Sequence, residues 1–137
     1  MGTWGPGIFE NDGALDYIGQ VMLQLEETIS TCLATPGAAD LDEDGESVLV
    51  PSVALLSLLS EHTGAAPPSP ELVREWREAY VAIFDEQIDH LDPAPGYKEA
   101  RRQVIVDTFA RLEARAREFS GDASADTADE EGEQEES

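Results

Sequence analysis

The chain has 137 residues, with 30 Asp and Glu against 8 Lys and Arg, so its formal net charge is −22. Such an excess of acid argues against duplex nucleic acid and against anionic membrane surfaces as ligands, because both require a cationic face. No apolar run of about 20 residues and no basic segment followed by an apolar one occurs, so we expect neither a membrane span nor a secretion signal. The single cysteine, Cys32, permits no internal disulfide and fits a reducing compartment.

The distribution of acid predicts the domain boundary. Residues 121–137 hold eight carboxylates and no base, and nothing in this stretch is more apolar than Ala. Such a segment cannot offset the entropy lost on ordering, so we expect a disordered acidic tail. The preceding residues 1–120 form one predicted helical domain, whose net charge is −22 + 8 = −14.

Residues 11–62 predict two helices. Asn11 or Asp12 can cap the first, and Thr35 is the first residue of the Thr-Pro-Gly sequence that ends it. Its apolar stripe is Leu15, Ile18, Met22, Leu25, Ile29 and Cys32. Residues 48–50 are expected to be extended, since Pro51 disfavours helix at the residue before it. A short helix over residues 51–62 is apolar on most sides, which predicts a place at the centre of a bundle.

Two further helices follow after a Gly- and Pro-rich break. Ser69 and Pro70 predict the start of the third, which extends to about Leu91. Its stripe is Leu72, Trp76, Tyr80, Ile83, Phe84, Gln87, Ile88 and Leu91. The fourth covers residues 97–119, with a predicted buried side of Val104, Ile105, Thr108, Leu112 and Phe119. Most bases lie on it, so we expect it to pack against acidic neighbours such as the third helix. The fold class is all-α, a bundle of about four helices.

The opening of the chain is its most unusual part. Glycines at three of six positions permit tight turns, and large aromatic anchors stand beside them. We interpret the segment as a Gly/Trp clasp, in which the aromatic side chains fill the end of the bundle and polar residues cap the first helix. The candidate binding residues of this motif are Trp4, Phe9, Glu10, Asn11, Asp12 and Asp16.

This opening resembles that of the bacterial domain-of-unknown-function family numbered 4259, whose members begin with Met-Gly-x-Trp-Gly-x-Gly-x-Phe-Glu-Asn-Asp. The sequence departs from the family pattern at Gly13, where relatives carry an acid, and at Tyr17, where they favour Trp. The matching positions are Gly2, Trp4, Gly5, Gly7, Phe9, Glu10, Asn11, Asp12, Ala14 and Asp16. The resemblance implies a small cytoplasmic bacterial domain and supplies no activity, so no catalytic residue can be carried over.

Residues 40–46 are the best metal candidate. They reproduce the D-x-D-x-D-G opening of an EF-hand calcium loop, with Asp40, Asp42 and Asp44 as the oxygen ligands. The rest of the motif is missing, because Ser47 stands at the eighth position and Pro51 at the twelfth, where a bidentate Glu belongs. A solvated acidic loop is therefore the alternative to weak calcium binding.

Other chemistry has less support. Neither His62 nor His90 has the spacing of a zinc or di-iron ligand set, and no cofactor is indicated. Cys32 lies on an apolar stripe, as an inert buried thiol does. Glu10, Asp12 and Asp16 could form the carboxylate group of an enzyme, although capping explains the first two more simply.

The sequence as a whole predicts a non-enzymatic protein that binds a macromolecule, namely a basic protein. Its negative field would attract a cationic partner and accelerate their encounter. A toxin-neutralising, immunity-like protein or a nucleic-acid-mimicking inhibitor fits such a field. The competing interpretations are a domain whose acidity only maintains solubility, a calcium-responsive module, and a carboxylate-based enzyme.

Overall fold

A computed structural model describes the backbone of residues 5–127 and the side chains of residues 5–121. The predicted all-α class is confirmed: four helices dominate, and the described residues contain no strand. The helices are α1 (Asp12–Ala34), α2 (Val50–Thr63), α3 (Pro70–Gln87) and α4 (Tyr97–Thr127). A π-helical turn, η1 (Gly45–Leu49), precedes α2, and a 3₁₀ turn, η2 (Ile88–Leu91), follows α3. None of the described helices is long and apolar enough to cross a membrane.

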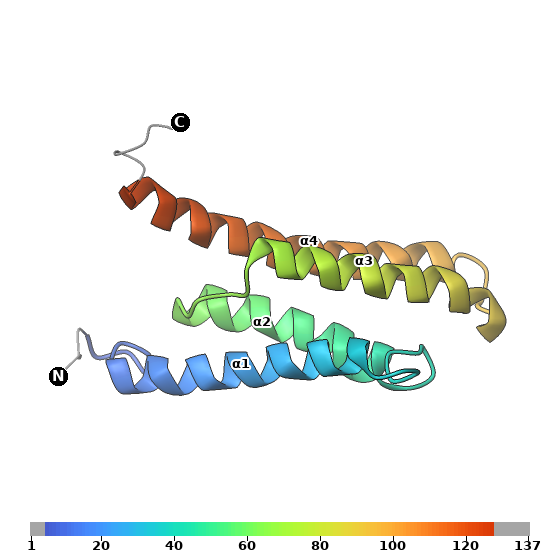
Figure 1. Cartoon of the computed structure of the whole chain (residues 1–137), viewed down its shortest axis with the longest axis horizontal. Helices are drawn as coiled ribbons and strands as arrows, with labels where there is room; N and C mark the ends of the chain where they lie inside the picture. The colour runs from blue at the N-terminus through green and yellow to red at the C-terminus, as the bar shows by residue number, and fades with distance from the viewer. Residues whose placement is uncertain (1–4, 128–137) are drawn as a thin grey trace.

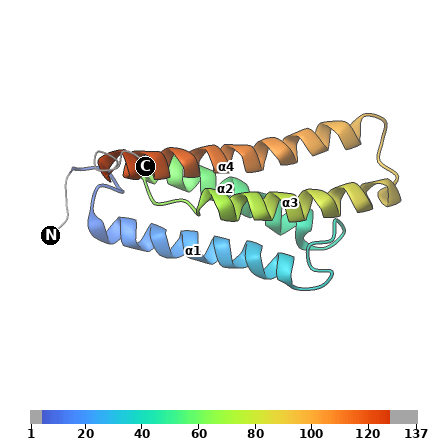
Figure 2. The same cartoon turned by 45° about the horizontal axis from the view of Figure 1, so that its top comes forward.

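The helices form two hairpins that stack on each other. In Figure 1 the α1–α2 hairpin lies below the α3–α4 hairpin, and α1 runs in the same direction as α3. Helix α2 packs against both α1 and α4, as its apolar character predicted, and Figure 2 shows it behind the other three. Of the four neighbouring helix pairs, α1 and α3 touch least.

Side-chain caps fix where α1 and α3 begin. The Asn11 Oδ1 atom accepts a hydrogen bond of 2.7 Å from the Ala14 N–H, and the Ser69 hydroxyl accepts one of 3.2 Å from the Leu72 N–H. Both satisfy amides that a helix start leaves without an intrahelical partner. These are the positions at which the sequence predicts caps.

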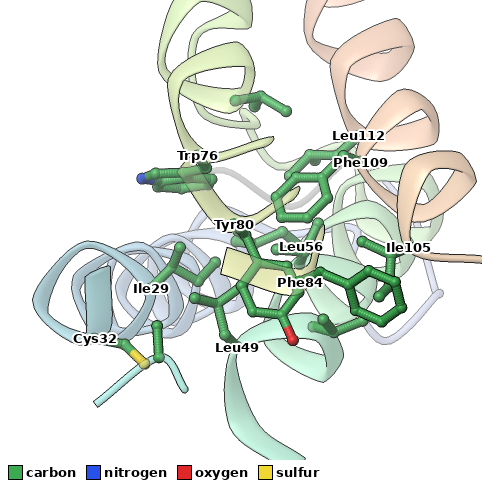
Figure 3. Close-up of a cluster of buried hydrophobic side chains, with 14 of the residues drawn as sticks. Ile29, Cys32, Leu49, Leu56, Trp76, Tyr80, Phe84, Ile105, Phe109 and Leu112 are labelled. Carbon is green, nitrogen blue, oxygen red and sulfur yellow. The ribbon is translucent and has the colours of Figure 1, made fainter. Parts of the chain in front are cut away.

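The core lies where the four helices converge. Tyr80 and Phe84 of α3 are almost completely buried, and Phe109 of α4 packs its ring 6.3 Å from that of Tyr80. Figure 3 shows these rings beside Ile29 of α1 and Leu56 of α2. The Cys32 thiol is buried at the edge of this core, and burial followed by the charge of Asp44 raises its pKa. A raised pKa suppresses the nucleophilic thiolate, as expected for a structural cysteine.

The prediction of extended backbone at residues 48–50 is wrong. Val50 is helical, with φ −64° and ψ −45°, and its N–H donates to the Gly45 carbonyl, which closes the π-helical turn. Pro51 stands in the first turn of α2, directly after the π-helical turn, and proline is common in the first turn of a helix. Leu49 is fully buried and Val50 nearly so, and this burial outweighs the local preference imposed by proline.

The predicted buried side of α4 is also partly wrong. Val104 and Phe119 remain 49% and 37% exposed. The buried apolar residues are Ile105, Phe109, Leu112 and Ala116, which follow the three- and four-residue spacing of one helix face. Helix α4 continues to Thr127, beyond Phe119, and residues 128–137 of the predicted tail lie outside the described residues.

Gly45 allows η1 to pack tightly, and this generates a prediction. A Cβ atom at position 45 would overlap the Ala39 carbonyl oxygen and lie 2.9 Å from Cε1 of Tyr80. Gly45→Ala should therefore lower the free energy of unfolding by about 1–3 kcal/mol through overpacking. Gly19→Ala is the matched control, because its Cβ would meet nothing within 4 Å and α1 should gain about 1 kcal/mol. Urea titration of both variants would contradict this account if Gly45→Ala were as stable as the wild type.

Candidate functional site

The described part of the N-terminal motif is a turn closed by Glu10. Its Oε1 accepts a 2.8 Å hydrogen bond from the Gly7 N–H, and a Cβ atom on Gly5 would overlap the same oxygen. Trp4 lies outside the described residues. Phe9 is 37% exposed and lies outside the buried cluster, so the expectation that it fills the bundle is wrong. The reason is its position: the first buried residue of α1 is Ile18, so the turn lies beyond the end of the core.

Asp12 and Asp16 are exposed on α1, one turn apart. Neither forms an ion pair or a side-chain hydrogen bond with another described residue. Glu10 is engaged in the turn and Asn11 in the cap. The hypothesis of a carboxylate enzyme at Glu10, Asp12 and Asp16 stays a prediction.

The loop of residues 40–46 is held by Gln87 of α3. The Gln87 Nε2 donates to Asp40 Oδ1 at 2.7 Å, and its Oε1 accepts from the Leu41 N–H at 2.9 Å. Asp42 and Asp44 are exposed. Among residues 5–121, no group of three or more His, Cys, Asp and Glu side chains is arranged to hold a metal. Calcium binding by the loop stays a prediction.

The ion pairs use every base in the chain. Lys98 pairs with Asp89 at 3.1 Å and Arg102 with Asp85 at 2.8 Å, which confirms the predicted attraction of α4 to the acidic third helix. Other pairs join α4 to the first hairpin, including that of Arg111 with Glu61 of α2. The bases of all eight pairs are Arg74, Arg77, Lys98, Arg101, Arg102, Arg111, Arg115 and Arg117.

Glu113 of α4 is a buried carboxylate that binds three arginines. Its side chain is 7% exposed, and it accepts from Arg77 at 2.8 Å, Arg74 at 3.3 Å and Arg117 at 2.6 Å. This cluster was not predicted from the sequence. Two signals were available: the i, i+4 spacing to Arg117, and a pair of arginines three residues apart on a helix that is otherwise acidic.

Glu46 forms a second internal anchor at η1. Its two oxygens accept from the Tyr80 hydroxyl at 2.8 Å and from Arg101 Nε at 2.7 Å. Burial, followed by the hydrogen bond to Glu46, raises the pKa of Tyr80. The anchor therefore ties the end of the acidic loop to both α3 and α4, and it uses the carboxylate that would have been the seventh residue of a calcium loop.

The remaining carboxylates of the first hairpin have no base among the described ion pairs. No Lys or Arg occurs before Arg74, whereas twelve of the 30 acidic residues do. Of these twelve, only Glu46 and Glu61 are paired with a base. Helix α1 also exposes Tyr17 and Leu23 by 66% and 64%. This combination of uncompensated acid with exposed large side chains makes α1 and its loop the candidate binding surface.

The arginine cluster gives a stability prediction. Glu113→Gln keeps the side-chain volume but removes the charge that three guanidinium groups share. We expect the free energy of unfolding to fall by about 1–3 kcal/mol, less than for fully buried pairs because the arginines reach solvent. Glu86→Gln, an exposed acid of α3 without an ion pair, should stay within about 0.5 kcal/mol of the wild type. Equal unfolding curves for the two variants would contradict a stabilising cluster.

The anchor at Glu46 gives a prediction for alkaline pH. Because the pKa of Tyr80 is raised on folding, the unfolded chain releases this proton first, from about pH 10, and stability falls as pH increases. Tyr80→Phe should cost about 1–2 kcal/mol at neutral pH through the lost hydrogen bond. It should also flatten the decline above pH 10, whereas Tyr17→Phe at an exposed site should leave the decline unchanged. Unfolding free energies at several pH values test this, and parallel curves for all three proteins would refute it.

Comparison with known proteins assigns the family. No curated protein and no solved structure shows detectable similarity to this chain. The model of the family described as "Domain of unknown function (DUF4259)" matches residues 2–134, nearly the whole sequence. The chain therefore belongs to the DUF4259 family.

Proposed function

We propose that this protein is a non-enzymatic binding protein of the bacterial cytoplasm, immunity- or inhibitor-like, whose partner is a basic protein. The observation that carries the proposal is the internal pairing of all eight bases. The carboxylates of α1 and of residues 40–44 are left without a cation among the described ion pairs. All of them are exposed except Glu26 and Asp40, which are half-buried.

The charge asymmetry supports the first hairpin as the surface that meets the partner. Residues 70–121 contain every Lys and Arg of the chain, eight against eleven acidic residues, whereas α1 and the loop carry acid alone. A surface of one sign attracts a partner of the opposite sign over several ångströms and raises the association rate by about 10–1,000-fold at low salt. Nucleic acid and anionic membranes lack this attraction, so we expect binding to neither.

The test is capture of basic proteins at controlled ionic strength. The immobilised full-length chain should retain basic proteins from a lysate of its own cells at about 50 mM NaCl and release them at about 500 mM, where charges are screened within a few ångströms. A variant with amides in place of four exposed acids of the first hairpin should lose this capture. The four are Asp12, Asp16, Glu27 and Asp42.

A charge-matched control separates surface from net charge. Glu130, Glu131, Glu133 and Glu135 near the C-terminus can be changed to Gln, which removes the same four charges. If the first hairpin is the binding surface, this control retains most of the captured protein. If the wild type loaded at low salt releases no basic protein at about 500 mM NaCl, the proposed function is overturned, and equal losses in both variants would mean that only net charge matters.

A further inference from the structure

The seam between α1 and α3 forms a groove on the surface. Its volume is about 320 Å³, and Leu33 of α1 and Leu72 and Trp76 of α3 provide apolar walls. Ala34 and Ala79 lie along the same groove. Their small side chains keep it open, at the seam where two neighbouring helices touch least. The volume is enough for one or two apolar side chains of a ligand.

Trp76 fixes the floor of the groove. Its Nε1–H donates to the Ser30 hydroxyl of α1 at 3.2 Å, across the seam. In Figure 3 the ring nitrogen of Trp76 points away from the other labelled core residues. The indole is only 3% exposed, so it closes the core beneath the groove and is held in place by this hydrogen bond.

A second hollow adjoins the groove on α1. It has a volume of about 400 Å³, is lined by residues of α1 that include Leu23, Glu26 and Glu27, and shares Ser30 with the groove. From Leu23 to Ala34 the helix rises about 16 Å at 1.5 Å per residue. The groove and this hollow thus follow one another along the helix, an arrangement that suits an elongated ligand.

Both hollows are lined by acid and by no base. Glu75 of α3 lines the α1–α3 groove, and Glu26 and Glu27 of α1 line the adjoining hollow. Glu26 is half-buried without an ion pair or side-chain hydrogen bond to another described residue, and burial raises its pKa. A cation placed against Glu26 would relieve the unfavourable burial of this charge.

Another surface hollow of similar size has different electrostatics. It lies between α3 and α4, with a volume of about 440 Å³, and its lining includes Arg77 and Arg102 together with Asp85. Arg102 pairs with Asp85 at 2.8 Å, and this hydrogen-bonded pair lowers the pKa of Asp85. That hollow has two bases beside its two carboxylates, Glu78 and Asp85, whereas acid and no base lines the α1–α3 groove.

We propose that the α1–α3 groove binds an amphipathic helix of a basic protein. Apolar residues of that helix would pack on Leu33 and Leu72 above the buried Trp76, and its Lys or Arg side chains would reach Glu75 in the groove and Glu26 in the adjoining hollow. Insertion of a helix into a groove between helices is an established mode of recognition, with anchors spaced three and four residues apart. The inference rests on the proposed function and adds the position of the site and the secondary structure of the ligand.

The test uses a defined probe, a fluorescein-labelled Leu/Lys peptide of about 14 residues with an amphipathic helical pattern. Fluorescence anisotropy measures its affinity for the full-length chain and for Ala79→Arg, which places bulk and positive charge in the groove. We expect about tenfold weaker binding by this variant. Ala110→Arg, at an exposed position of α4 outside the groove, adds the same charge and should weaken binding by no more than about twofold.

A second variant tests the site with a substitution that is expected to leave the fold intact. Glu26→Gln removes a half-buried unpaired charge, so its thermal stability should equal or exceed that of the wild type, while peptide affinity falls about threefold. Unchanged affinity in Glu26→Gln and equal affinity in the two Ala→Arg variants would overturn the groove while leaving the proposed function intact. No binding of the peptide by the wild type also overturns the groove, and the separate capture experiment then decides whether the proposed function survives.

Discussion

The ion pairing of α4 is the constraint on which the rest of the molecule depends. Six of the eight bases lie on this helix, and they reach carboxylates of η1, α2, α3 and η2 as well as of α4 itself. The two bases of α3, Arg74 and Arg77, complete the set by meeting Glu113 of α4. Every ion pair in the described residues therefore includes a residue of α4. The acid of α1 and its loop is left without a base among the described ion pairs, as are α3 carboxylates such as Glu75 and Glu86.

Most of these pairs matter more for where charge lies than for stability. Arg102 and Asp85 are each nearly half exposed, and such surface pairs contribute about 0–1 kcal/mol. Glu113 and Glu46 differ because their carboxylates are largely enclosed and accept more than one hydrogen bond. The hydrophobic core around Tyr80 and Phe84 remains the main source of stability, and the pairs determine which face of the bundle stays negative.

The sequence predicts those features that depend on neighbouring residues. The caps at Asn11 and Ser69 and the stripe of α1 follow from local spacing, and the structure has them where expected. Val50 and the buried side of α4 were misjudged because burial against other helices overrides a proline preference and selects Phe109 over Val104. For Glu113 the sequence offers only the spacing to Arg117 and the pair Arg74 and Arg77, while its burial and the α1–α3 groove depend on how α3 packs, which no pattern within one helix encodes. The acidic residues of the first hairpin can be counted in the sequence. That most of them have no base beside them is known only from the ion pairs of the structure.

The negative field of the first hairpin and the α1–α3 groove would act on a basic partner at different distances. Solvated carboxylates such as Asp12 and Asp42 act over about a Debye length, roughly 8–10 Å at physiological salt, so they accelerate encounter without selecting an orientation. A half-buried carboxylate such as Glu26, beside apolar walls, is screened less by salt. It interacts strongly only with a cation placed directly beside it. Long-range attraction alone would leave a chain of this charge unselective among basic proteins. Selectivity therefore requires a feature with defined geometry, and the α1–α3 groove with its adjoining hollow combines apolar walls with the half-buried charge of Glu26, which has no base among the described ion pairs.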